Sequence, residues 1–67
     1  MQVTKHTTVR YTVVYNNEEC ILDTEKVNKA LKMAETCAKC AEHPCTYDVY
    51  CKSICSSIRI ATYEVTE

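Results

Sequence analysis

One long stretch of the chain repeats its apolar residues at intervals of three and four positions. Between residues 23 and 43 these are Val27, Ala30, Leu31, Ala34, Ala38 and Ala41. Lysine, glutamate and threonine occupy much of the remaining surface, so the apolar residues form one stripe of an α-helix. The pattern predicts an amphipathic helix over residues 23–43, whose alanines would let it lie close against a sheet.

The predicted helix has a clear beginning and end. Asp23 is the expected N-cap, because its carboxylate can accept hydrogen bonds from the free amides of the first turn. Leu22 and Val27 then take the positions of a hydrophobic staple. Pro44 disfavours helical geometry at the residue before it, so we expect the helix to end at His43, whose ring can bond to the last carbonyls.

Before the helix, apolar and polar residues alternate. Residues 3–15 are rich in valine, threonine and tyrosine, with most of the apolar side chains at odd positions, which predicts a long β-strand. Asn16 and Asn17 follow, and asparagine tolerates positive φ. We therefore expect a tight hairpin turn that leads into a short strand over residues 19–22.

After the helix, the alternation resumes. A strand around residues 47–51 is followed by a polar, irregular loop and by a final strand over residues 57–65. The apolar positions of the final strand change phase, from even at Ile58 to odd at Tyr63. A β-bulge near Ala61 would account for the change.

The resulting order, β-β-α-β-β, predicts an α+β fold in a single domain of residues 1–67. The simplest arrangement is one antiparallel four-stranded sheet with a single helix packed on one face. We expect the long first and last strands to pair, which would leave the short strands at the edges. The predicted binding residues are Tyr50, Arg10 and Arg59, on the face away from the helix, because tyrosine and arginine are enriched in protein interfaces.

Length and charge narrow the classes of function. A chain of 67 residues buries only about 60% of its unfolded surface, so its core is marginal and often needs a staple or a partner. The net charge of −1 and the lack of a basic stripe argue against nucleic-acid binding. No apolar run approaches the roughly 20 residues of a membrane span, so we expect no membrane partner. Without a phosphate loop or a serine-triad signature, we do not expect an enzyme.

Six cysteines leave three alternatives open. In the first alternative, the cysteines are free thiols that act as small buried apolar side chains, as Cys51 on the inward side of its strand would. In the second alternative, some of the cysteines bind zinc. The four thiols that could most easily coordinate one tetrahedral ion are those of Cys37, Cys40, Cys51 and Cys55. In the third alternative, the cysteines form disulfides, and their spacing in the sequence does not determine which cysteines pair. A redox role for Cys37 and Cys40 is not expected, because the C-terminal end of a helix opposes a thiolate.

The compartment depends on how the chain begins. Residues 1–10 lack the apolar stretch of a signal peptide. If Met1 is the natural start, we expect a cytoplasmic protein, acting in a host cell, with reduced thiols. A removed leader would reverse that expectation and favour a secreted, disulfide-stapled protein.

The whole chain resembles the small accessory proteins of bacteriophages and mobile elements, including anti-CRISPR-like inhibitors. The resemblance is one of plan, carried by VRYTVVYNNEECIL, DTEKVNKALKMAE, TYDVY and SIRIATYEV. It implies a non-enzymatic protein without a cofactor that binds a host protein or protein complex and inhibits a bacterial defence system. The contact would use the sheet face or an edge strand, and a homodimer through the same surfaces is a further expectation. The alternative is a zinc- or disulfide-stapled module that contacts nucleic acid or acts as a secreted effector.

Overall fold

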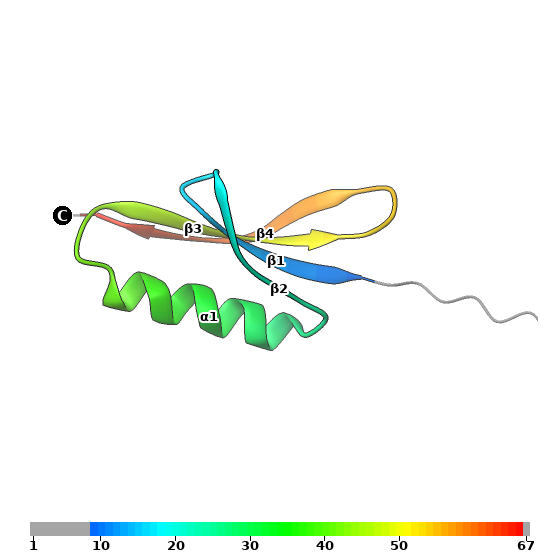
Figure 1. Cartoon of the computed structure of the whole chain (residues 1–67), viewed down its shortest axis with the longest axis horizontal. Helices are drawn as coiled ribbons and strands as arrows, with labels where there is room; N and C mark the ends of the chain where they lie inside the picture. Colours follow the sequence, from blue (N-terminus) through cyan, green and yellow to red (C-terminus); the bar gives the residue numbers. More distant parts are fainter. Residues whose placement is uncertain (1–8, 67) are drawn as a thin grey trace, which may run out of the picture.

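The computed structural model describes residues 9–66. Its elements are β1 (Arg10–Tyr15), β2 (Glu19–Thr24), α1 (Val27–Cys40), β3 (Cys45–Lys52) and β4 (Ser57–Val65). The strands form one antiparallel four-stranded sheet, and α1 runs along one of its faces (Figure 1). The predicted α+β plan is therefore confirmed. The part of the predicted first strand in residues 3–8 lies outside the described residues.

The order of the strands differs from the expectation. The sheet runs β2-β1-β3-β4, so the first and last strands do not pair, and β4 lies at an edge. Contacts of the first hairpin turn explain the order. The N–H of Asn16 donates to the carbonyl of Thr46 at 2.9 Å, and the N–H of Thr46 donates to Oδ1 of Asn16 at 2.9 Å. The ring centroids of Tyr15 and Tyr47 lie 5.2 Å from each other. Together with the two hydrogen bonds, this contact holds β3 beside β1.

The first hairpin turn is formed as predicted. Asn16 and Asn17 have φ of 49° and 60°. The N–H of Glu18 donates to the carbonyl of Tyr15 at 3.0 Å and closes the turn. Positive φ at both central residues is the pattern of the hairpin turn whose twist matches that of the flanking strands.

α1 begins later than predicted, because β2 continues to Thr24. Asp23 is therefore not the N-cap, and its Oδ1 instead accepts a hydrogen bond from Nε of Arg10 at 2.7 Å. Lys26 is the residue that precedes the helix, and its N–H donates to Oγ1 of Thr24 at 3.2 Å. With Lys26 at the cap, Leu22 no longer occupies the predicted staple position. Because Asp23 pairs within the sheet, it does not serve as the N-cap that the neighbouring sequence predicts.

α1 also ends earlier than predicted. Its last residue is Cys40, and Ala41 already has extended geometry, with φ of −69° and ψ of 137°. Pro44 thus lies beyond the end of the helix and is not its immediate cause. The ring of His43 does not cap the helix either, since its Nε2 lies 3.3 Å from the hydroxyl of Tyr15.

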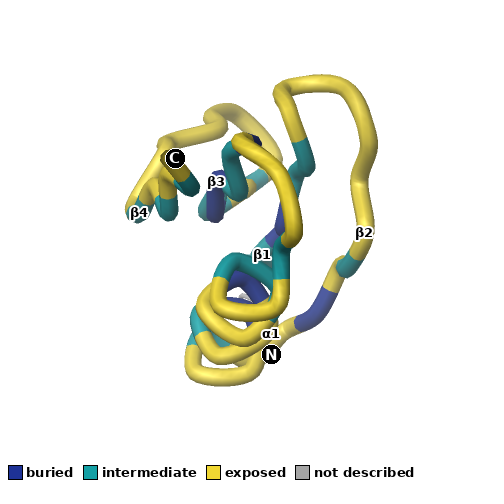
Figure 2. Tube along the Cα trace, turned by 90° about the vertical axis from the view of Figure 1, so that its left-hand side faces the viewer, coloured by how far each residue is buried: buried dark blue, intermediate teal, exposed yellow. Residues whose placement is uncertain are grey.

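The core lies between α1 and the two central strands. Its fully buried residues are Val13, Ala30, Ala34 and Val49. Half-buried side chains surround them, namely Tyr11, Leu22, Leu31, Tyr47, Ala61 and Tyr63. We call the side of the sheet that carries these residues the helix face, and the opposite side the free face. Figure 2 shows the buried positions on α1, β1 and β3, whereas β2 and β4 are largely exposed.

β4 changes phase at a bulge. Tyr50 faces Arg59, and the residue before Tyr50 faces Ala61, so Ile60 is the additional residue. The predicted bulge near Ala61 is confirmed. Because one residue is left out of the alternation, Ile58 lies on the helix face together with Ala61, although their numbers differ in parity.

Candidate functional site

The three predicted binding residues lie together on the free face. Tyr50 of β3 lies in register between Thr12 of β1 and Arg59 of β4. Arg10 lies two positions from Thr12 along β1 and faces Lys52. Side chains opposite one another in an antiparallel sheet point to the same face. The placement agrees with the prediction, and the role of these residues in binding stays a prediction.

Of the three predicted binding residues, Arg10 is the least available for contact with a partner protein. Besides the bond from Nε to Asp23, its Nη1 lies 3.4 Å from Oε1 of Glu25. The hydrogen bond to Asp23, and then the negative charge of that carboxylate, raise the pKa of Arg10. Two carboxylates thus already neutralise the guanidinium, and its main effect is to hold the beginning of β1 against the end of β2.

Lys52 and Arg59 are the available cations of this surface. Both side chains are exposed, and within residues 9–66 neither takes part in a salt bridge. Lys52 borders two open hollows of about 320 and 260 Å³. Ile54 lines the first of these hollows and Tyr50 the second. Tyr50 thus lies beside two cations that have no salt-bridge partner within residues 9–66.

Exposed isoleucines gather toward the β3–β4 hairpin. The exposed fractions are 88% for Ile54, 61% for Ile58 and 43% for Ile60. The hairpin reaches beyond the first turn of α1, so the helix does not cover it (Figure 1). Lys52 and Ile54 were not among the predicted binding residues, because they lie in a stretch that the sequence pattern indicated as a polar loop. An isoleucine within that loop was the signal that could have identified them.

Two polar residues on the free face are buried. Thr12 is 3% exposed and Asp48 is 2% exposed. The hydroxyl of Thr62 donates to Oδ1 of Asp48 at 2.7 Å, which provides a buried carboxylate with the partner that it requires. This contact joins β4 to β3. We therefore assign Asp48 a structural role.

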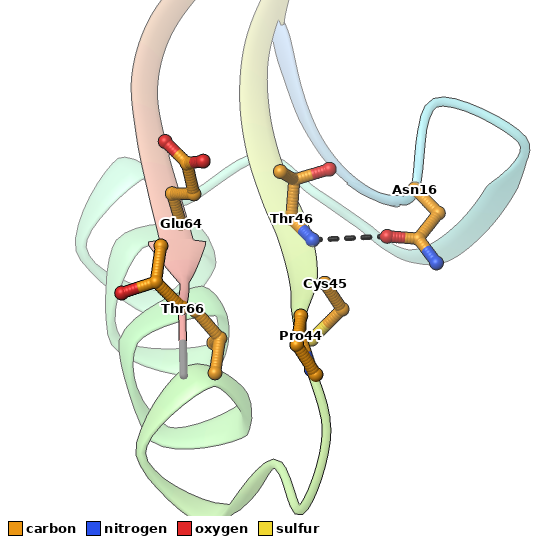
Figure 3. A pocket seen from close by; sticks show the side chains of 7 residues that line it. Asn16, Pro44, Cys45, Thr46, Glu64 and Thr66 are labelled. Carbon is orange, nitrogen blue, oxygen red and sulfur yellow. Dashed lines mark hydrogen bonds between the residues drawn. The ribbon is translucent and has the colours of Figure 1, made fainter.

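A third hollow, of about 460 Å³, lies at the other end of the sheet (Figure 3). The side chain of Asn16 lines it and bonds to the backbone of Thr46. Glu64 and Thr66 border it from the end of β4, and Cys45 lies buried at its base. No hydrogen bond or salt bridge within residues 9–66 links Cys45 to Glu64, so the hollow offers no ready catalytic pair.

The four predicted zinc ligands are not brought together. Cys37 and Cys40 lie at the C-terminal end of α1, whereas Cys51 and Cys55 lie at the far end of β3 and in the loop after it. The strand from Cys45 to Cys51 spans about 20 Å, at about 3.3 Å per residue. Among residues 9–66, no three His, Cys, Asp or Glu side chains form a group that could hold a metal ion. The structure thus does not bring the predicted set together, because β3 carries its second pair away from the first, and zinc binding stays a prediction.

All six thiols are free in the structure. Cys45 is buried, and Cys51 is half-buried on the helix face, which fits the role of small apolar side chains. Burial raises the pKa of Tyr47, and the neighbouring thiols of Cys45 and Cys37 add to this shift.

No helix in the described part of the chain is long and apolar enough to cross a membrane. Comparisons with protein-family models, with curated proteins and with solved structures found no match.

Proposed function

We propose that this chain is a small, non-enzymatic interaction protein that binds a host protein through its free face. The observation that carries the proposal is Tyr50, half-exposed on a central strand and flanked by the free cations Lys52 and Arg59. Tyrosine and arginine dominate the residues whose truncation most weakens protein complexes. A rigid aromatic ring also loses little conformational entropy when it is buried.

The charges of this surface indicate the character of the partner. Lys52 and Arg59 are not neutralised within residues 9–66, and the nearby carboxylate of Asp48 is buried and bonded to Thr62. Ile54 adds exposed apolar area beside Lys52. The surface therefore suits a protein with an apolar contact patch and an acidic rim, because opposite charges speed association and orient the complex.

Affinity capture with matched variants tests this proposal. The tagged chain is used to capture proteins from a bacterial host extract, and the captured protein is then purified and titrated by calorimetry. We expect Tyr50→Ala to weaken binding by about 2 kcal/mol or more. Lys32→Ala, at an exposed position of α1, is the control and should bind like the unsubstituted chain. Equal affinity for both variants would exclude the free face as the binding surface.

A finer proposal is that the partner belongs to a bacterial defence system. It rests on the resemblance in plan to phage and mobile-element accessory proteins. Expression of the chain in bacteria that carry such a system should restore phage growth, and Tyr50→Ala should abolish the effect. Unchanged phage restriction across the tested systems, despite binding in the capture experiment, would refute the finer proposal and leave the interaction role intact.

A further inference from the structure

β4 is a long edge strand that, apart from its bulge at Ile60, lacks the usual protections against pairing. It has nine residues, pairs with β3 on one side and lies at the margin of the sheet (Figure 2). It contains no proline, and its two charged residues, Arg59 and Glu64, both point to the free face. Natural edge strands are commonly short, or carry proline or inward-pointing charges that prevent another strand from pairing.

We propose that β4 pairs with β4 of a second copy of this chain, antiparallel and in a register centred on Thr62. The two-fold axis of such a pair is perpendicular to the sheet, so both copies of α1 lie on the same side. The result is one continuous sheet across the dimer. The pair uses the outer edge of β4 and shares only Arg59 with the surface around Tyr50, and the inference goes beyond the proposed function.

The bulge at Ile60 makes this register self-consistent. Outward from Thr62, Ala61 faces the partner's Tyr63, and both residues lie on the helix face. Arg59 and Ile60 together then face the partner's Glu64, as they together face Tyr50 in β3. The next pair is Ile58 with the partner's Val65, again both on the helix face. Every pair therefore keeps its two side chains on one face, as an antiparallel ladder requires.

Charge complementarity selects this register among its neighbours. Centred on Thr62, it places Arg59 opposite the partner's Glu64, and the two-fold axis repeats the pair. With the centre moved to Ala61, Glu64 would face the partner's Ser57, and with the centre at Tyr63 it would face the partner's Thr62. Within one copy, Arg59 and Glu64 form no salt bridge with each other. Their charges are satisfied only across the proposed pair.

The same register covers exposed apolar surface. A groove of about 620 Å³ lies between α1 and β4, with Ala38 and Val65 among its lining residues. Ile58, which is 61% exposed, would lie beside the partner's Val65 and so at the partner's groove. At the rim of the groove, Lys39 is already paired with Glu35 at 2.9 Å, and Glu64 is the carboxylate that the proposed register pairs with the partner's Arg59. The two-fold axis gives each copy one filled groove.

The expected association is a concentration-dependent equilibrium. A single strand pair with one isoleucine per groove buries less than the about 1,600 Å² of a standard interface. Sedimentation equilibrium of the full chain over a range of concentrations, with a thiol reductant, measures the dissociation constant. We expect Arg59→Glu and Glu64→Arg each to raise it by about tenfold or more, because each variant places like charges opposite one another twice.

A mixture of the two variants provides the decisive measurement. In a heterodimer of Arg59→Glu with Glu64→Arg, both charge pairs are again complementary, so the mixture should dimerise about as tightly as the unsubstituted chain, although each variant alone dimerises more weakly. Glu19→Lys, a charge reversal on the β2 edge, is the control and should dimerise like the unsubstituted chain. Circular dichroism verifies that each variant is folded. A chain that stays monomeric, or a mixture of folded variants that does not dimerise, would overturn the proposal.

Discussion

β2 and β4 lie at opposite edges of one sheet and differ in how their outer sides are protected. β2 has six residues and is interrupted by a bulge, because Val13 faces Leu22 whereas Val14 faces Cys20. It then runs directly into the loop that begins α1. β4 has nine residues, and its bulge leaves the helix-face pattern intact on both sides.

The difference explains why one edge is suited to association and the other is not. A bulge bends its strand and leaves a residue unpaired, so a short bulged strand offers a poor template for another chain. A surface that pairs only with itself gives a closed dimer, whereas two open edges would permit growth into a fibre. In the proposed dimer, the two-fold pairing at β4 uses both β4 edges, and the protection of β2 would prevent further growth into a fibre.

The largest expected effect comes from charge on the helix face of the open edge. Ile58→Lys places an ammonium group where the register buries an isoleucine, and we expect it to abolish dimerisation while the monomer remains folded. Ile21→Lys makes the same change at an exposed isoleucine of β2 and should leave association unchanged. Sedimentation equilibrium distinguishes the two variants. Equal loss of dimer in both would contradict the contrast between the edges.

A smaller effect is expected on stability, at the contact that anchors β4. Thr62→Val removes the donor to Asp48 and leaves a buried carboxylate oxygen without that bond, which costs about 1–3 kcal/mol. Urea unfolding under dilute, monomeric conditions measures the change. Thr66→Val, at an exposed position just after β4, is the control and should stay within about 0.5 kcal/mol. Coincident unfolding curves for both variants would show that the bond does not anchor the edge.

The smallest effect is expected at the anchor of β2. Asp23→Ala removes the exposed pair with Arg10, whose strength is reduced by water and by salt. We expect a smaller shift of the urea midpoint than for Thr62→Val, and its disappearance at about 1 M salt, where charges are screened within about 3 Å. A shift that is equally large at low and high salt would mean that Asp23 acts through packing.

Features governed by neighbouring residues were predicted correctly. Asn16 and Asn17 indicated the turn because few residues accept positive φ. The phase change indicated the bulge at Ile60, because alternation in a strand has a strict period of two. The alanines of the helix indicated a close approach to the sheet, and Ala30 and Ala34 are fully buried there.

Features governed by distant pairing were predicted incorrectly. Asp23 resembles an N-cap, yet it lies in β2, where Thr12 faces it in β1 and its carboxylate binds Arg10. The structure also separates the cysteines of the proposed zinc set, because β3 carries Cys51 away from Cys37 and Cys40, and zinc binding stays a prediction. The position of β4 at an edge followed from contacts between Asn16 and Thr46, which are separated by the whole helix.

The sequence by itself determined the elements of this protein, their order and the faces that they bury, because period and turn chemistry act within a few residues. Only the tertiary structure decided which strands are neighbours and therefore which edge stays open. Strand order depends on hydrogen bonds and packing between residues that are far apart in the chain. The alternation of apolar and polar residues is the same in an edge strand as in a central strand, so it does not indicate strand order. The open β4 edge, and with it the proposed dimer, could be recognised only from the folded chain.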